Sequence, residues 1–167
     1  QCTDKRVNIV TERLFKKANT PAEIIALGLA DLETEIHDCG LFRNKAKNIL
    51  ATCQILCEKY HGTVPDDFAE LQKLPGVGRK TANVVESVGF NHPAIAVDTH
   101  VFRVANRLQL AVGATPLAVE NELKKVIPKA KWSAAHHWLI WHGRNICKAR
   151  KPLCDRCPLL RLCPSAE

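Results

Sequence analysis

Residues 71–82 read LQKLPGVGRKTA, and this stretch decides the fold. Apolar residues anchor a short helix on each side of a turn that contains two glycines, Gly76 and Gly78. Glycine lets the backbone turn sharply and leaves its N–H groups accessible. The helix that begins at Arg79 then presents unpaired N–H donors and the positive end of its dipole. The stretch therefore predicts a helix-hairpin-helix motif.

Such a hairpin can hold the phosphate backbone of DNA without reading base sequence, because backbone N–H groups at a helix start bind phosphate. The alternative is an ordinary tight connection between two helices, which a lone G-x-G would favour. Here the full string is present, with apolar residues that anchor both helices, and it favours phosphate binding. Gly76, Gly78 and Arg79 are therefore candidate DNA-binding residues.

Lys80 lies in the first turn of the second helix. The helix N-terminus and the neighbouring Arg79 both disfavour a further positive charge at this position, and partial burial would add to that effect. An uncharged lysine amine could attack a sugar carbon and form a Schiff base. The local sequence leaves open the alternative that Lys80 is a second lysine in contact with phosphate.

Asp98 is the second candidate for chemistry, within the string VDTHVFR at residues 97–103. An aspartate at this point commonly caps the helix that follows it. A carboxylate near Lys80 could instead accept the lysine proton and stabilise positive charge that develops on a sugar ring. It would also favour the protonated amine and so oppose the effect of the helix, and the sequence leaves open which influence is larger.

Four cysteines near the end of the chain follow the pattern C-x6-C-x2-C-x5-C: Cys147, Cys154, Cys157 and Cys163. Thiols this close in sequence can converge on one metal centre. Zinc sites often use two CxxC pairs, whereas only residues 154–157 have that form, and the spacing alone leaves zinc and an iron–sulfur cluster open. Residues 143–167 carry six basic and two acidic side chains, which accounts for much of the net charge of +7. A metal site surrounded by positive charge indicates an anionic partner such as nucleic acid.

The other four cysteines show no pattern of disulfide pairing. Cys53 and Cys57 lie on an apolar helical stripe, where free cysteine packs as a small hydrophobe, and Cys2 and Cys39 have no partner in the sequence. Neither a signal peptide nor a run of 18 apolar residues is present. We therefore expect a reducing, cytoplasmic compartment and no membrane association.

Helical periodicity recurs from end to end of the chain. Its clearest case is the stripe from Ala46 to Tyr60, and the capping box Thr20-Pro21-Ala22-Glu23 and the pair Thr115-Pro116 each begin a helix. Further helices are expected at Lys5–Lys17, Asp31–Asp38, Asp67–Lys73, Arg79–Val88, Thr99–Leu108 and Ser133–Ile146. No alternating strand pattern of useful length occurs, so the predicted class is all-α. In the last of these helices, His136, His137, Trp138, Trp141 and His142 fit a core or an interface with the cysteine loop.

Several long strings together resemble the endonuclease III family of DNA base-excision glycosylases. They are QCTD at 1–4, GLFRNKA at 40–46, LPGVGRKTANVV at 74–85, AVDTHVFRVANR at 96–107, HHWLIWHGR at 136–144 and the four-cysteine loop. They occur in the family's order and cover essentially the whole chain. The resemblance implies a helix-hairpin-helix DNA glycosylase fold with two helical lobes: a barrel-like lobe at 1–93 and a lobe at 94–167 that ends in an iron–sulfur cluster loop. Asn91-His92-Pro93 is the expected crossing between the lobes, and the active site would lie between them.

The resemblance also implies roles for single residues. Lys80 would be the nucleophile, Asp98 the assisting carboxylate, and the four clustered cysteines the ligands of a [4Fe-4S] cluster. Gln1 matches the glutamine that enters the space left by an extruded base. Leu41 matches the leucine that wedges the opposite strand, although a leucine after a glycine is otherwise ordinary packing.

The activity implied is that of a bifunctional enzyme, which acts on double-stranded DNA with damaged bases or abasic sites. It removes oxidised pyrimidines and cleaves the resulting abasic site by β-elimination through a lysine Schiff base. Adenine-specific mismatch glycosylases share the scaffold but typically lack the lysine, so Lys80 favours the bifunctional reading. A DNA-binding module without catalysis is the main rival, and a lesion-cleavage assay separates the two. We expect a monomer that acts on the nucleoid of a bacterium.

The family has further helices before the opening glutamine, and they supply part of both lobes. The chain starts abruptly at Gln1 and contains no Met. The expectation from this comparison is that the chain is a fragment, and that residues 1–167 expressed alone fold poorly or act weakly. A cooperative thermal transition together with normal activity would refute that expectation.

Overall fold

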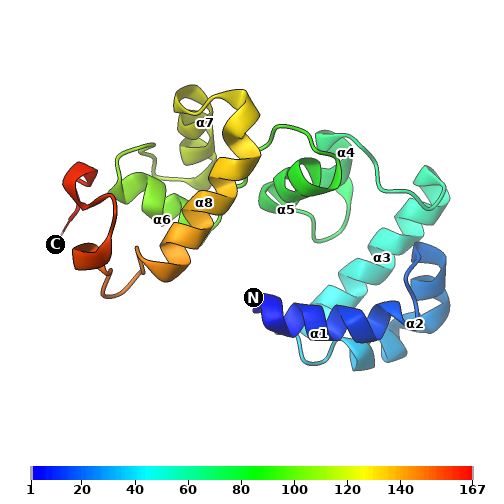
Figure 1. Cartoon of the computed structure of the whole chain (residues 1–167). Coiled ribbons are helices and arrows are strands. Elements are labelled where there is room, and N and C mark those ends of the chain that lie inside the picture. The colour runs from blue at the N-terminus through cyan, green and yellow to red at the C-terminus, as the bar shows by residue number, and fades with distance from the viewer. Residues whose placement is uncertain (1, 167) are drawn as a thin grey trace. The chain divides into compact units, whose positions relative to one another are not determined.

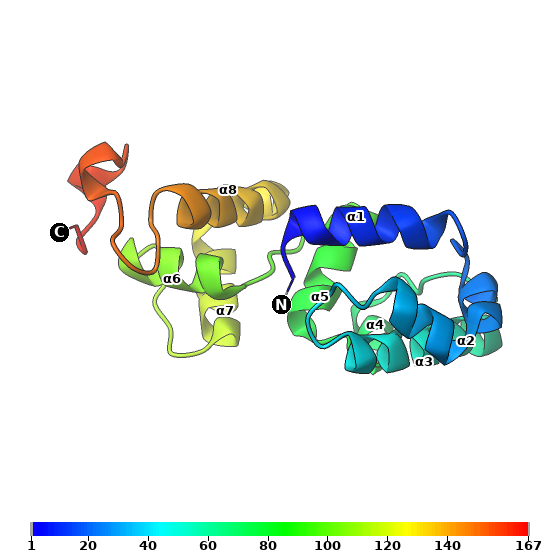
Figure 2. The ribbon, with the colours of Figure 1, turned by 90° about the horizontal axis from the view of Figure 1, so that it is seen from below.

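The computed structural model describes residues 2–166, and every regular element within that range is a helix (Figures 1 and 2). The α-helices are α1 (Asp4–Phe15), α2 (Pro21–Glu35), α3 (Phe42–Tyr60), α4 (Phe68–Lys73), α5 (Arg79–Val84), α6 (Thr99–Arg107), α7 (Pro116–Val126) and α8 (Trp132–Asn145). Four short turns complete the fold: η1 (Val85–Gly89), η2 (Lys129–Lys131), η3 (Cys154–Arg156) and η4 (Leu160–Leu162). The predicted all-α class is confirmed.

The chain divides into two compact units, Gln1–Val77 and Gly78–Glu167. The helix-hairpin-helix stretch therefore links the end of one unit to the beginning of the other. The lobe boundary expected after residue 93 stays a prediction.

In the first unit, α1, α2 and α3 pack around a small apolar core. Val10, Leu14, Leu32, Ile36 and Ala46 are among its buried side chains. The predicted capping box is present at the start of α2: the Thr20 hydroxyl accepts from the Glu23 N–H, and the Glu23 carboxylate accepts from the Thr20 N–H. The same helix is kinked at Gly28, where φ is 78°. Glycine is suited to this position because it adopts a positive φ more readily than any other residue. This kink explains why the sequence pattern suggests a separate helix starting near residue 31.

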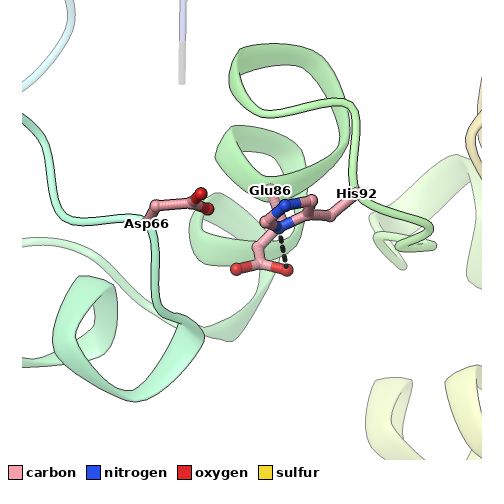
Figure 3. A group of neighbouring side chains, drawn as sticks. All are labelled: Asp66, Glu86 and His92. Atoms are coloured by element: carbon pink, nitrogen blue, oxygen red, sulfur yellow. Dashed lines mark ion pairs between the residues drawn. The ribbon is translucent and has the colours of Figure 1, made fainter.

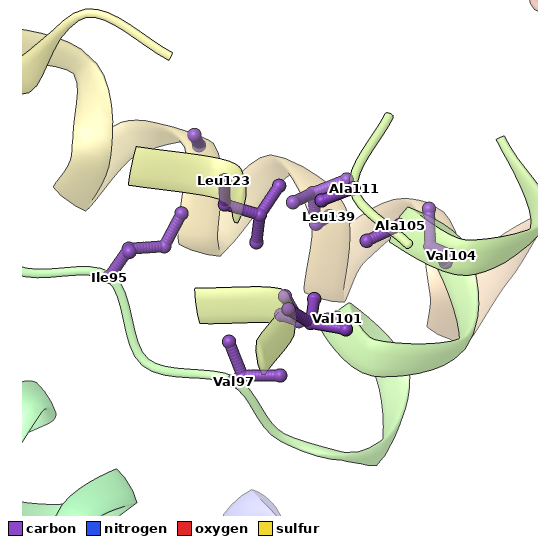
Figure 4. Close-up of a cluster of buried hydrophobic side chains, with 10 residues drawn as sticks. Ile95, Val97, Val101, Val104, Ala105, Ala111, Leu123 and Leu139 are labelled. Atoms are coloured by element: carbon purple, nitrogen blue, oxygen red, sulfur yellow. The ribbon is translucent and has the colours of Figure 1, made fainter. Parts of the chain in front are cut away.

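The core of the second unit lies between α6, α7 and α8 (Figure 4). Buried side chains come from each of these helices and from the chain before α6: Ile95, Val101, Val104, Val119, Leu123 and Leu139. Helices α6 and α8 approach closely at Gly143, where an added Cβ would lie 3.0 Å from the His100 Cβ and 3.1 Å from a Val104 methyl group. This close contact holds the beginning of α6, and with it Asp98, against the rest of the unit.

A π-helical turn, η1, continues α5 and ends in a loop at residues 90–93. The Glu86 carbonyl accepts from the His92 N–H at 2.9 Å, and the carboxylate of Glu86 lies 3.5 Å from the Nδ1 atom of the same histidine (Figure 3). The four residues Ala94–Val97 then run extended and fully buried into α6. The fixed loop therefore connects the helix that carries Lys80 to the helix that Asp98 caps.

The last part of the chain has little core of its own. No residue between 144 and 166 is buried, and only the two short turns η3 and η4 form there. A segment without buried apolar side chains has too little burial to offset the entropy of ordering its backbone. Something other than hydrophobic packing must hold this loop in shape. Within the described residues, no helix is long and apolar enough to cross a membrane.

Candidate active site and cluster-binding loop

Only one of the two hairpin glycines is required by its backbone conformation and its close neighbours. Gly76 has φ 77°, and a Cβ at this position would lie 2.8 Å from Asn48 Nδ2 and 3.2 Å from its Cβ. Gly78 has φ −87°, and a Cβ there would meet nothing within 4 Å. The first glycine is therefore required by the turn itself. The second is dispensable for the fold, and its backbone is open to approach from outside.

Lys80 occupies the first turn of α5, as the sequence predicts. Its side chain is exposed and not partly buried.

Asp98 is the N-cap of α6, and this confirms the ordinary structural role of an aspartate at a helix start. Its Oδ1 atom accepts hydrogen bonds from the N–H groups of His100 and Val101, both at 2.8 Å. Within the described part of the chain, its Oδ2 atom has no hydrogen-bond partner. The cap therefore uses one carboxylate oxygen and leaves the other available for chemistry.

The charges of both candidates affect the pKa of one buried histidine, His136. His136 on α8 is 4% exposed, and its Nδ1 atom lies 2.7 Å from the Ala96 carbonyl oxygen. Burial lowers the pKa of His136; the Ala96 hydrogen bond and the charge of Asp98 oppose that shift, while the charge of Lys80 adds to it. Both candidate side chains thus act electrostatically on one ring. Lys80 and Asp98, which are 18 positions apart in the sequence, both belong to the second unit.

Arg79 has a partner that the sequence does not reveal. Its guanidinium donates two hydrogen bonds to the carboxylate of Glu120 on α7, from Nε at 2.7 Å and from Nη2 at 2.8 Å. Glu120 is 2% exposed. These residues are 41 positions apart, and no local pattern marks the glutamate as anything but a helix residue. The predicted contact of Arg79 with DNA would therefore compete with this ion pair for the guanidinium.

The four clustered cysteines all line one cavity, which has about 380 Å³ of empty space including the part open to solvent. All four are free thiols and are partly exposed. An arginine supports the first of them: Arg107 Nη1 lies 3.5 Å from the Cys147 sulfur, and the same guanidinium donates to the carbonyls of Lys148 and Ala149 at 2.7 and 3.1 Å. The cavity therefore has the thiols of a metal site and a cation beside them.

The spacing of the sulfurs bears on which metal fits. A tetrahedral zinc with Zn–S bonds of about 2.3 Å would bring its four thiolates to within about 3.8 Å of one another. Among the residues that the structure describes, no three of these cysteine sulfurs lie within 4.8 Å of one another. A polynuclear cluster separates its ligands further, because each sulfur binds a different iron. The donor set and its spread fit an iron–sulfur cluster.

Comparison with known proteins decides the family. Residues 1–129 match the model of the HhH-GPD superfamily of base excision DNA repair proteins, and residues 147–163 match the iron–sulfur binding domain of endonuclease III. Endonuclease III of Rickettsia conorii is 56% identical over 163 residues, which are 98% of this chain and 78% of that protein. The chain belongs to the endonuclease III family.

Solved structures of endonuclease III agree with this assignment. A trapped covalent intermediate of endonuclease III with DNA superposes with a TM-score of 0.95 at 56% identity, over 99% of this chain and 78% of that chain. A non-covalent endonuclease III–DNA complex gives the same TM-score at 55% identity and the same coverage. The helix-hairpin-helix glycosylase fold expected from the sequence is confirmed.

The family match also resolves the metal. The matched domain begins at Cys147 and ends at Cys163, so all four clustered cysteines lie within it. The cofactor is a [4Fe-4S] cluster, and the alternative of zinc is excluded. When bound, the cluster supplies iron–thiolate bonds that hold the shape of a loop with no buried core of its own.

Leu41 has a conformation that ordinary packing does not explain. It precedes α3 with φ 56° and ψ 35°, in the left-handed region, and its side chain is 60% exposed. A leucine in that region is a strained backbone outlier, and such outliers cluster at functional sites. The other strand-probing residue expected from the family resemblance, Gln1, lies outside the described residues.

The aromatic residues of α8 divide between the core and a groove shared with the cysteine loop, as expected. His136 is buried as expected, but Trp138 and Trp141 are not part of the core, with 60% and 64% of their surface exposed. They line a groove together with Pro158 and Leu159 of the cysteine loop. Trp138 and Trp141 therefore take the second of the two expected roles, at the interface with the cysteine loop.

Proposed function

We propose that this chain removes oxidised pyrimidines from double-stranded DNA, with Lys80 as the nucleophile and Asp98 as the assisting carboxylate. As a member of the endonuclease III family, it is a base-excision glycosylase with abasic-site lyase activity. The observation that carries the residue assignment is the geometry of two helix starts in one unit: Lys80 lies in the first turn of α5, and Asp98 caps α6. The unpartnered Oδ2 atom of Asp98 supports the same assignment.

DNA binding would use charge and backbone rather than base contacts. The basic side chains of the cysteine loop and the N–H groups at Gly76, Gly78 and Arg79 would hold phosphates. The damaged base would leave the stack at a cost of a few kcal/mol, which is lower for a lesion that already stacks poorly. Leu41 would fill the opposite strand and Gln1 the emptied position. The exposed, strained position of Leu41 supports that role.

The proposed reaction begins with the amine of Lys80. The Lys80 nitrogen attacks the sugar C1′, the bond from C1′ to the base breaks, and Asp98 stabilises the positive charge on the ring and takes the proton from the amine. The sugar ring then opens: the C1′–O4′ bond breaks, O4′ takes up a proton, and a Schiff base forms at C1′, which acidifies the neighbouring C2′–H. Removal of that proton expels the 3′ phosphate and breaks the strand. Sodium borohydride should reduce the Schiff base and leave the protein covalently bound to lesion-bearing DNA.

The protein would act as a monomer in the bacterial cytoplasm, at the nucleoid, with a barrel-like lobe at 1–93 and a cluster lobe at 94–167. An excision panel on oligonucleotides with different single lesions would test the preference for oxidised pyrimidines. Failure of the wild-type chain to become trapped on an abasic site would contradict the proposed chemistry.

Asp98→Asn should separate the cap of α6 from catalysis. Asparagine keeps an oxygen that can accept from His100 and Val101 and is as good an N-cap as aspartate, so the free energy of unfolding should change by less than about 1 kcal/mol. It cannot take a proton or stabilise a cation, so single-turnover base excision should slow by about a hundredfold or more. Denaturant unfolding and single-turnover kinetics measure the two effects.

The control for this experiment is Asp98→Ala, which removes the cap as well. It should cost about 0.5–2 kcal/mol of stability and slow excision as much as the asparagine variant. Wild-type rates in the asparagine variant would reduce Asp98 to a structural residue.

Alanine in place of Gly76 should affect the stability of the fold, whereas alanine in place of Gly78 should affect mainly the affinity for DNA. Gly76→Ala forces alanine into a left-handed conformation against Asn48 and should destabilise the fold by about 1–2 kcal/mol. Gly78→Ala meets no atoms and should change stability by less than about 1 kcal/mol. Its new methyl group would nevertheless obstruct a phosphate that approaches the backbone, and we expect affinity for DNA to fall by about tenfold. Unfolding curves and fluorescence anisotropy with an abasic-site duplex measure these effects. Unchanged affinity in the second variant would place the phosphate elsewhere.

A further inference from the structure

The carboxylate of Glu120 is buried and accepts four hydrogen bonds from three side chains. Its Oε2 atom accepts from Arg79 Nε at 2.7 Å and from Asn83 Nδ2 at 3.1 Å. Its Oε1 atom accepts from Arg79 Nη2 at 2.8 Å and from Lys124 Nζ at 2.6 Å. Burial by itself would raise the pKa of Glu120, but the hydrogen bonds from Arg79 and Lys124 outweigh it and hold that pKa below the ordinary value. The group is therefore an ionised, buried carboxylate.

The partners of Glu120 lie on two different helices. Lys124 is on α7 itself, one turn after the glutamate, and contributes only to its own helix. Arg79 and Asn83 are both on α5, four residues apart and hence on one face of that helix. Asn83 is 3% exposed and donates to the same carboxylate as Arg79, so this face of α5 carries both bonds to α7. The carboxylate thus connects α7 to α5 at two successive turns.

The helix that receives this contact is too short to orient itself. Helix α5 has six residues, and an isolated helix of that length is not stable in water. Its direction is set by its contacts with the rest of the unit: the burial of Ala82, the hydroxyl contact between Ser87 and Ser133 just after it, and the Glu120 carboxylate. The Glu120 carboxylate is bonded to Arg79, the residue directly before Lys80.

We propose that Arg79 and Glu120 are positioning residues for the reaction, because they fix the first turn of α5 and so the direction in which the Lys80 amine points. This inference rests on the proposed function, in which Lys80 is the nucleophile. It assigns the Arg79 guanidinium to Glu120 and leaves its backbone N–H for phosphate. The site is sensitive to such a link because a misplacement of about 1 Å at a reacting atom can cost about a hundredfold in rate.

The test uses four variants of the full chain: Arg79→Met, Glu120→Gln, Glu120→Asp and Lys124→Met. Each is assayed on an abasic-site duplex for its dissociation constant, for the fraction of active molecules by burst titration, and for the single-turnover rate of borohydride trapping. Arg79→Met and Glu120→Gln should each slow trapping per active molecule by about ten- to a hundredfold, with little change in the dissociation constant. The aspartate variant keeps the charge and should recover part of the rate. The double variant Arg79→Met/Glu120→Gln should be no slower than the slower single variant, because both remove one link.

Lys124→Met is the matched control. It also removes a cation from Glu120, but it leaves α5 attached, so its trapping rate should stay within about twofold of wild type. Arg79→Met leaves Lys124 and Asn83 on the buried carboxylate, which keeps one informative variant folded if Glu120→Gln is unstable.

Three outcomes would overturn the inference. A wild-type trapping rate in Glu120→Gln or in Arg79→Met would show that the link does not position Lys80. Weaker DNA binding with a smaller salt dependence in Arg79→Met, at an unchanged trapping rate, would make Arg79 a phosphate contact. No trapping by the wild-type chain would overturn the proposed function and this inference with it.

Discussion

Lys80→Ala should abolish borohydride trapping on abasic-site DNA and reduce strand cleavage by at least about a thousandfold, while the affinity for DNA falls by less than about tenfold. The rate depends on a covalent bond that only an amine at this position forms, and removal of a nucleophile typically costs several orders of magnitude. The affinity depends on many phosphate contacts, of which one lysine supplies at most one. Denaturing gel electrophoresis after borohydride treatment measures the covalent product, and fluorescence anisotropy measures the affinity.

The control for this experiment is Lys73→Ala. Lys73 belongs to the same hairpin stretch, but its amine pairs with Glu70 at 2.5 Å and its side chain is 63% exposed. Loss of an exposed ion pair costs little, so this variant should trap DNA at close to the wild-type rate. Persistent trapping by the Lys80 variant would mean that another amine is the nucleophile, and Lys80 would then be a phosphate contact.

Cys157→Ser should remove the iron–sulfur cluster and disorder the loop that carries it. Serine is a poor ligand for iron, and loss of one thiolate from a four-cysteine site destabilises the whole cluster. Because no residue from 144 to 166 is buried, the loop has no apolar core to keep its shape without the metal. The iron content should fall well below about four atoms per chain, the brown absorbance should disappear, and the affinity for DNA should weaken by about ten- to a hundredfold.

Hydrogen exchange would locate this effect. Protection of the Cys157, Leu160 and Cys163 amides, which donate to carbonyls within η3 and η4 and between them, should be lost. Cys57→Ser is the matched control, because Cys57 lies on α3 of the first unit and is not a ligand; it should keep the iron and the exchange pattern. An intact loop in iron-free Cys157→Ser would show that the cluster is not what holds the loop.

Features that depend on neighbouring residues were predictable from the sequence. The capping box at Thr20, the hairpin turn at Gly76 and the cap at Asp98 each involve atoms within about four residues of one another, and all three are present. The apolar period of the helices also gave the all-α class, because a helix must bury one face whatever it packs against. The cysteine spacing marked a metal site because thiols close in sequence can converge on one metal centre. It did not distinguish zinc from iron.

Features that depend on distant residues were decided only by the tertiary structure. Nothing near Glu120 in the sequence indicates that its carboxylate is buried against Arg79, and nothing near Asp98 shows that one of its oxygens is left unpaired. The strained, exposed conformation of Leu41 and the exposure of Trp141 are equally invisible in the sequence. Local hydrogen bonds and periodicity are encoded along the chain, whereas burial and ion pairing depend on which helices meet, and that is set by the packing of the whole unit.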